Sequence, residues 1–271
     1  MFEVRPIGRN CGAEIIGYRA EDAARSGIPT DLRAAFLHYK VLVFRDQDLS
    51  TAQLKAFGQA WGPLAQQVLP ERTVPGHPEV QILEHDERHP PDYYWHADLT
   101  WHPTPPLGAI LLSRELPSVG GDTLFADMEA AYAGLSDRMK TYLQDLVAIH
   151  DRTMPLHRRG VSPQAIYEFQ QKFSPSEHPV VRTHPETGRK LLFINGAYTT
   201  KIKDLPMAES QHVLDFLFTL TDVPEYQCRV RWLPGTMTMW DNRAVQHYAV
   251  GDYMPERRRM ERVVIAGDRP A

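Results

Sequence analysis

The sequence is poor in cysteine, with two in 271 residues. Cys11 and Cys228 lie far apart, and neither belongs to a CxxC pair or to a cluster with metal-ligand spacing. Two distant cysteines cannot provide the dense disulfide framework of small secreted domains. The sequence therefore predicts free thiols in a reducing, cytoplasmic setting.

A long hydrophobic run and a surplus of positive charge are also missing. No window approaches the ~18 consecutive apolar residues of a membrane span, and the first residues, MFEVRPIGRNCGAEI, lack the apolar stretch of a secretory signal. The formal net charge is −4, so nothing suggests a nucleic acid or an anionic membrane as the main partner. With 42% hydrophobic and 24% charged residues, the chain has the composition of a globular protein.

Strand-like segments predominate along the chain. Short apolar runs and alternating patterns predict strands at 2–6, 12–17, 41–44, 80–83, 95–101, 108–114, 122–126, 179–184, 189–195, 226–233, 236–241, 245–250 and 257–266. Helical spacing of apolar residues predicts helices at 31–39, 51–61, 128–133, 137–146 and 207–221. We therefore expect a mainly β fold with flanking helices (α+β), in the form of a double-stranded β-helix or jelly roll.

No internal repeat or low-complexity tract divides the chain, so residues 1–271 are expected to form a single domain. Two long segments interrupt the regular elements. Residues 62–94 are rich in proline, histidine and acidic residues, and long connections of this kind are often functional loops. Residues 151–178 are polar, basic and interrupted by prolines, which predicts a mobile flap.

The segment WHADLTW places a histidine and a carboxylate two residues apart, at His96 and Asp98. On a strand these side chains share one face and can chelate one cation. Imidazole with carboxylate suits iron(II) better than magnesium or calcium. An HxD pair by itself is usually structural, so a third ligand is required. His102 would lie ~20 Å along the same strand, which favours His247 on a second strand.

The last predicted strand carries several arginines. Period-two alternation puts Arg258 and Arg262 on one face, about 13 Å apart at ~3.3 Å per residue. If this face lines the interior, each guanidinium needs an anion, because an unpaired buried charge is very costly. The alternative is a solvated edge strand whose charges block pairing with other chains. The nearby His247 favours an anion site.

Together these motifs resemble the taurine dioxygenase superfamily, of the TauD/TfdA type. WHADLTW is followed by Pro105-Pro106, by GGDTLF at 120–125, by WDNRAVQHYA at 240–249 and by the arginine-rich last strand. VVRTHPETGRKLLFIN at 180–195 and the terminal GDRP extend the resemblance over nearly the whole chain. The resemblance implies a double-stranded β-helix and an enzyme that uses iron(II), 2-oxoglutarate and dioxygen.

The resemblance also implies roles for single residues. His96, Asp98 and His247 match the family's metal ligands. Thr123 and Arg258 match residues that bind the far carboxylate of 2-oxoglutarate.

Three further residues are candidates for binding. Arg262 matches the arginine that binds the acidic group of the substrate in several members of the family. Trp240 is a candidate contact of the cofactor, and Tyr198 is a candidate stacking contact of the substrate. Packing in the core explains either aromatic residue about as well.

The loops depart from the pattern of taurine-specific members. Those members carry a histidine after the first helices and an asparagine just before the HxD motif, where this chain has Gln67 and Asp92. Leu69 replaces a tyrosine near that histidine, and Tyr93 and Tyr94 precede the ligand segment. We therefore expect Gln67 and Asp92 at the substrate site, and a substrate with an apolar or aromatic body instead of taurine.

The sequence thus predicts an iron(II)- and 2-oxoglutarate-dependent dioxygenase. It would hydroxylate a small anionic organic substrate, such as a sulfonate, sulfate ester or carboxylate, and release succinate and carbon dioxide. Two other functions stay open: a catalytically inactive anion-binding barrel, and a zinc hydrolase with the same three ligands, which would leave Arg258 unexplained. The expected partners are the small-molecule substrate and further copies of the chain in a homo-oligomer, and neither nucleic acid nor membrane.

Overall fold

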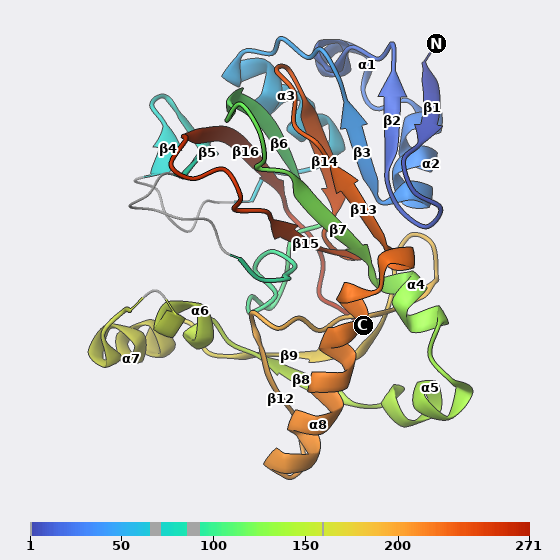
Figure 1. The fold of residues 1–271 in the computed structure, drawn as a ribbon, viewed down its shortest axis with the longest axis vertical. Helices are drawn as coiled ribbons and strands as arrows, with labels where there is room; N and C mark the ends of the chain where they lie inside the picture. Colours follow the sequence, from blue (N-terminus) through green and yellow to red (C-terminus); the bar gives the residue numbers. More distant parts are fainter. Residues whose placement is uncertain (1, 66–71, 86–92, 159) are drawn as a thin grey trace.

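An eight-stranded mixed sheet forms the upper part of the computed structural model, which describes residues 2–65, 72–85, 93–158 and 160–271 (Figure 1). Its strands follow in the order β1 (Glu3–Pro6), β2 (Ala13–Ile16), β3 (Val41–Phe44), β14 (Met237–Asp241), β6 (Gly108–Glu115), β16 (Arg258–Ile265), β5 (His77–His85) and β4 (Thr73–Val74). Neighbouring strands are antiparallel, except for β2 and β3, which are parallel.

A second sheet of three antiparallel strands packs against the large one. Its order is β13 (Gln227–Val230), β7 (Thr123–Asp127) and β15 (Val245–Ala249). The two inner faces meet in one buried apolar cluster, which joins Leu111 of the large sheet to Phe125 of the small one. Two sheets packed face to face in this way form a jelly roll, so the predicted fold class is confirmed.

Helices cover the other face of the large sheet. α2 (Thr30–Tyr39) and α3 (Thr51–Trp61) bury Phe36 and Phe57 against strand residues such as Leu42, in a second apolar cluster. The short segments η1 (Ala20–Asp22) and α1 (Ala23–Ser26) precede them. The alternating residues of each strand therefore divide between a helix-covered face and the interior of the jelly roll.

Local capping explains where two of the helices begin. Ser50 accepts a hydrogen bond from the backbone of Gln53, and the Gln53 side chain accepts one from the backbone of Ser50, so α3 starts with a capping box. Asp127 accepts two backbone hydrogen bonds in the first turn of α4 (Met128–Ala133). Both starts agree with the sequence prediction.

A third apolar cluster lies in the lower part of Figure 1. The elements of this part are α4, α5 (Asp137–Leu143), β8 (Val147–His150), β9 (Ser176–Pro179), β10 (Val181–Thr183), β11 (Lys190–Leu192), β12 (Thr199–Ile202), α8 (Met207–Phe218), η3 (Thr219–Asp222) and η4 (Pro224–Tyr226). β12, β8 and β9 form a three-stranded sheet, and β10 pairs with β11. Leu143, Leu191 and Leu214 are among the residues that this cluster buries.

The segment predicted as a flap contains regular structure. Within residues 151–178, α6 (Thr153–Arg158) and α7 (Pro163–Lys172) project to the side in Figure 1. The Ser162 side chain accepts a hydrogen bond from the backbone of Ala165, and proline follows at the first position of α7. Pro163, one of the prolines on which the prediction of an irregular flap was based, is the first residue of a helix.

The predicted strand at 95–101 is wrong. Only His96 makes a strand-like contact, an isolated antiparallel bridge with His247, and residues 98–101 form a turn. Leu99 has a φ of +52°, in the left-handed region, where an extended strand cannot continue. Strand alternation therefore does not place His96 and Asp98 on one face.

The structure describes the features behind the predictions about membranes and free thiols. Within the described ranges no helix has the length and apolar character required to span a bilayer. Cys11 and Cys228 are both buried and free, as predicted. The cytoplasmic setting and the homo-oligomer stay predictions.

Candidate active site

A cavity of about 180 Å³ lies between the two sheets of the jelly roll. Eight of the residues predicted from the sequence line it: His96, Asp98, Thr123, Tyr198, Trp240, His247, Arg258 and Arg262. The other two, Gln67 and Asp92, lie outside the described residues. The arginine-rich strand β16 lies between β6 and β5 in the large sheet. It is therefore not the solvated edge strand that the sequence left open as an alternative.

His96, Asp98 and His247 are buried, and their ligand atoms lie within 4.8 Å of one another. The two histidines come together because their backbones exchange two hydrogen bonds. The backbone N of His96 donates to O of His247 at 3.0 Å, and the backbone N of His247 donates to O of His96 at 2.7 Å. The Nδ1 atom of His96 lies 3.0 Å from the carbonyl oxygen of Tyr94. An Nδ1–H that donates to this carbonyl leaves the Nε2 lone pair for a metal. The donors and their spacing fit one transition metal ion.

Asp98 shares its carboxylate with Arg262. The Nη1 atom of Arg262 lies 3.0 and 3.1 Å from the two carboxylate oxygens, while its Nε and Nη2 atoms donate to Oε1 of Gln81 at 3.2 and 2.7 Å. Burial alone would raise the pKa of Asp98, but Arg262 and the two histidines outweigh burial and lower the pKa to about 2. The carboxylate is therefore ionised at neutral pH, as a metal ligand has to be.

Arg258 is buried in the same cavity, and among the described residues it forms no ion pair. It is 3% exposed, and its Nε atom reaches no acceptor there. Its Cζ atom lies 5.4 Å from the ring centre of Trp232, and Nε1 of Trp232 donates to Oγ1 of Thr123 at 3.0 Å. Burial lowers the pKa of the Arg258 guanidinium to about 10, which keeps it charged at neutral pH. The surroundings of Arg258 and Thr123 therefore favour an anionic ligand.

Tyr198 and Trp240 lie beside the His–Asp–His cluster. The ring centre of Tyr198 is 6.4 Å from that of His96, and the ring centre of Trp240 is 4.9 Å from that of His247. Arg152, just before α6, also lines the cavity. Both aromatic residues are therefore placed where a bound molecule could touch them, although their roles stay predictions.

Sequence reasoning missed some residues of the cavity. Gln81, Leu83 and His85 all line it from one face of β5. Gln81 and Leu83 lie within the strand predicted at 80–83, but no motif marked the face that they share as the inner one. His85 lies beyond the predicted strand, because β5 is nine residues long. Trp232 lies within the strand predicted at 226–233, but β13 ends at Val230 and Trp232 follows in an irregular segment, where strand alternation does not set the direction of a side chain. Gln81 matters most, because it is a hydrogen-bond partner of Arg262.

Comparisons with known proteins identify the family. The family described as "Taurine catabolism dioxygenase TauD, TfdA family" matches residues 3–264. The chain is 33% identical over 276 residues to the (S)-phenoxypropionate/alpha-ketoglutarate-dioxygenase of Sphingobium herbicidovorans, which covers 98% of this chain and 96% of that protein. It is 31% identical over 276 residues to the alkylsulfatase of Acinetobacter baylyi, with 98% and 86% covered. The crystal structure of a taurine dioxygenase from Burkholderia xenovorans matches with a TM-score of 0.85 at 30% identity, covering 100% of this chain and 91% of that one.

A jelly roll that encloses a His–Asp–His cluster and a buried arginine defines the class of protein, a 2-oxoglutarate-dependent dioxygenase. The chain belongs to the TauD/TfdA family of dioxygenases. The predicted enzyme class is thereby confirmed.

Proposed function

We propose that His96, Asp98 and His247 bind iron(II), and that Arg258 and Thr123 bind the far carboxylate of 2-oxoglutarate. One observation carries this proposal: two histidines and a carboxylate with the spacing of metal ligands share one cavity with a buried guanidinium that has no ion pair among the described residues. 2-Oxoglutarate offers a carboxylate for the guanidinium at one end and a 2-oxo acid for the metal at the other. A zinc hydrolase would leave the buried guanidinium unexplained.

The iron, when bound, supplies the oxidative chemistry, in which 2-oxoglutarate and dioxygen give succinate and carbon dioxide while a substrate C–H bond becomes C–OH. The chain supplies binding and orientation. The planar fork of Arg258 can bind a carboxylate with two hydrogen bonds. Because Trp232 donates to Oγ1 of Thr123, the Thr123 hydroxyl proton is available to the same carboxylate. Leu111 and Phe125 add apolar walls that exclude water.

The proposed substrate is a small organic anion with an apolar or aromatic body. Arg262 faces the cavity beside Asp98, and two of its nitrogen atoms are held by Gln81. A carboxylate, sulfate or sulfonate that displaces Gln81 would receive a bidentate pair from these atoms. Relatives named for phenoxypropionate and for alkyl sulfates support this class of substrate.

We expect alkyl and aryl carboxylates, sulfates and sulfonates to stimulate succinate formation more than taurine does. Among the described residues that line the cavity, Asp98 is the only acidic one, and it already pairs with Arg262. The ammonium group of taurine would therefore find no carboxylate available to it there. A screen of succinate production from 2-oxoglutarate and iron(II) measures this preference and also tests the proposed function. Taurine is the rival substrate in this screen, because a matched structure from Burkholderia xenovorans is described as a taurine dioxygenase. If taurine stimulates succinate formation most, the expected specificity is wrong.

The Arg262→Ala variant is expected to raise the KM for the best anionic substrate by roughly 10²-fold, as for the loss of a charge-assisted pair. Because Arg262 also pairs with Asp98, any loss of succinate formation without substrate measures the effect on that metal ligand, and the further loss with substrate measures the effect on substrate binding. Kinetics with and without substrate separate the two effects. An unchanged substrate KM, or a preference of the wild-type protein for neutral substrates, would refute the role of Arg262.

A further inference from the structure

The turn after β14 carries the side chain that holds Asp98. Oδ1 of Asn242 accepts a hydrogen bond from the backbone N of Asp98 at 2.7 Å, and Nδ2 of Asn242 donates to the backbone O of Asp98 at 2.9 Å. Asn242 is 1% exposed. The side-chain amide thus gives Asp98 the two hydrogen bonds that an adjacent strand gives to a residue in an antiparallel ladder.

Asparagine fits this contact because its amide has one acceptor and one donor side. Aspartate would keep the acceptor and turn a second oxygen toward the Asp98 carbonyl. Alanine would leave a buried N–H and a buried C=O of Asp98 without these partners, which destabilises the position of Asp98. The left-handed backbone at Leu99 prevents a strand ladder from replacing the amide.

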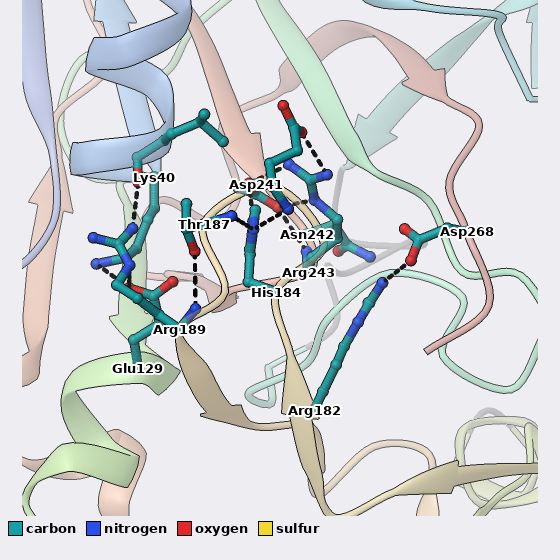
Figure 2. A network of polar contacts seen from close by, with 12 residues as sticks. Lys40, Glu129, Arg182, His184, Thr187, Arg189, Asp241, Asn242, Arg243 and Asp268 are labelled. Atoms are coloured by element: carbon teal, nitrogen blue, oxygen red, sulfur yellow. Dashed lines mark hydrogen bonds and ion pairs between the residues drawn. The ribbon is translucent and has the colours of Figure 1, made fainter. Parts of the chain in front are cut away.

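Buried ion pairs fix the two neighbours of Asn242 in the turn (Figure 2). The Asp241 carboxylate accepts from Nε and Nη2 of Arg243 at 2.8 and 2.7 Å and lies 3.0 Å from Nε2 of His184. Nδ1 of His184 accepts from the backbone N of Glu186 at 3.2 Å, so the ring proton lies on Nε2 and is donated to Asp241. Burial alone would raise the pKa of Asp241, but Arg243 and His184 hold it well below its usual range.

The three candidate metal ligands are therefore held in two different ways. His96 and His247 hold each other through their paired backbones. Asp98 lies in a turn, and the Asn242 amide links the backbone of that turn to the sheet. Loss of the amide would loosen one ligand of three and leave the cavity in place.

We infer that Asn242 is a positioning residue for the metal ligand Asp98. The inference rests on the proposed function, because it assumes that Asp98 binds the metal. The inference gives a role to the WDNR part of the segment WDNRAVQHYA. Asp241 and Arg243 fix the turn, and Asn242 between them forms the hydrogen bonds with Asp98.

Titration of the purified protein with Mn(II) tests this inference. For Asn242→Ala and Asn242→Asp we expect the Mn(II) Kd to rise by roughly 10–100-fold, as when a partner that orients a ligand is lost. Gln47→Ala is the matched control. Gln47 is also buried, and its amide accepts from the backbone of Ala20 and donates to that of Tyr18, both at 3.0 Å, without lining the cavity. This control should lose thermal stability and keep the wild-type Mn(II) Kd.

An unchanged Mn(II) Kd in a folded Asn242 variant would overturn the inference. If neither variant folds, amide hydrogen exchange in the metal-free wild-type protein decides: a protected Asp98 amide supports the contact with Asn242, and exchange at the rate of an open loop overturns it. Absence of Mn(II) binding by the wild-type protein would instead overturn the proposed metal site, and the inference with it.

Discussion

The His247→Ala variant is expected to lose more than roughly 100-fold of its 2-oxoglutarate-dependent succinate formation. Losing only the hydrogen-bond partner of a metal ligand typically costs up to roughly 100-fold, and losing the ligand itself should cost more. The substitution removes one of three donors from the cluster. It leaves the backbone hydrogen bonds between His247 and His96 intact, so the fold should survive. Succinate assays with saturating iron(II), together with circular dichroism, measure both properties.

His102→Ala is the matched control for this experiment. His102 follows the ligand segment closely and is the rival third ligand in the sequence, but it is exposed and does not line the cavity. Its loss should leave succinate formation at the wild-type level, whereas His96→Ala should behave like His247→Ala. Turnover at the wild-type rate in a variant of His96 or His247 would show that the metal ligands are assigned wrongly.

The Arg258→Ala variant is expected to need roughly 10²-fold more 2-oxoglutarate for half-maximal turnover, or more, because a bidentate charge-assisted pair is lost. Arg258 is buried and, within the described part of the chain, has no ion pair of its own, so a bound carboxylate is its natural counter-charge. The measurement is a 2-oxoglutarate titration of succinate formation at saturating iron(II).

Two variants sharpen this titration. Arg258→Lys keeps the charge and loses the planar fork, so its 2-oxoglutarate requirement should fall between those of the wild type and Arg258→Ala. Arg259→Ala removes the neighbouring arginine, which does not line the cavity, and should leave the titration unchanged. Equal titration curves for Arg258→Ala and the wild type would remove Arg258 from the co-substrate site.

The sequence was sufficient to predict β16 and to place Arg258 and Arg262 on one face, while the direction of that face was inferred from the nearby His247. Period-two alternation relates Arg258 to Arg262 whatever the neighbouring strands are. The sequence did not reveal that Arg262 already has a partner, because Asp98 lies 164 residues away and meets it only in the folded chain. The expectation of an external anion therefore applies to Arg258, which has no ion pair among the described residues, and is weakened for Arg262, which pairs with Asp98.

The placement of Asp98 shows a second limit of sequence reasoning. The HxD spacing agrees with a strand, yet Leu99 takes a left-handed conformation and the chain turns. Local residue types favour an extended segment there, and long-range hydrogen bonds from Asn242 replace the missing ladder. A pattern read along the chain detects periodicity, and it cannot detect a side chain that arrives from a distant turn, as that of Asn242 does.

The substrate loops mark a third limit. Gln67 and Asp92 lie outside the described residues, so their predicted contacts with the substrate stay predictions. Alternation in strands and the order of motifs are strong signals, whereas loop residues follow no such period. This difference explains why the structure brings the predicted metal ligands and Arg258 together in one cavity, while the predicted substrate contacts in the loops stay predictions.

The most direct test of iron(II)- and 2-oxoglutarate-dependent oxygenation is mass spectrometry of the succinate formed under ¹⁸O₂. The purified protein would be supplied with iron(II), 2-oxoglutarate and an aryl or alkyl anion as substrate. We predict one ¹⁸O atom in each succinate, and succinate formation that increases with the substrate. Succinate without the label, or conversion of the substrate with zinc in place of iron and without 2-oxoglutarate, would contradict the account.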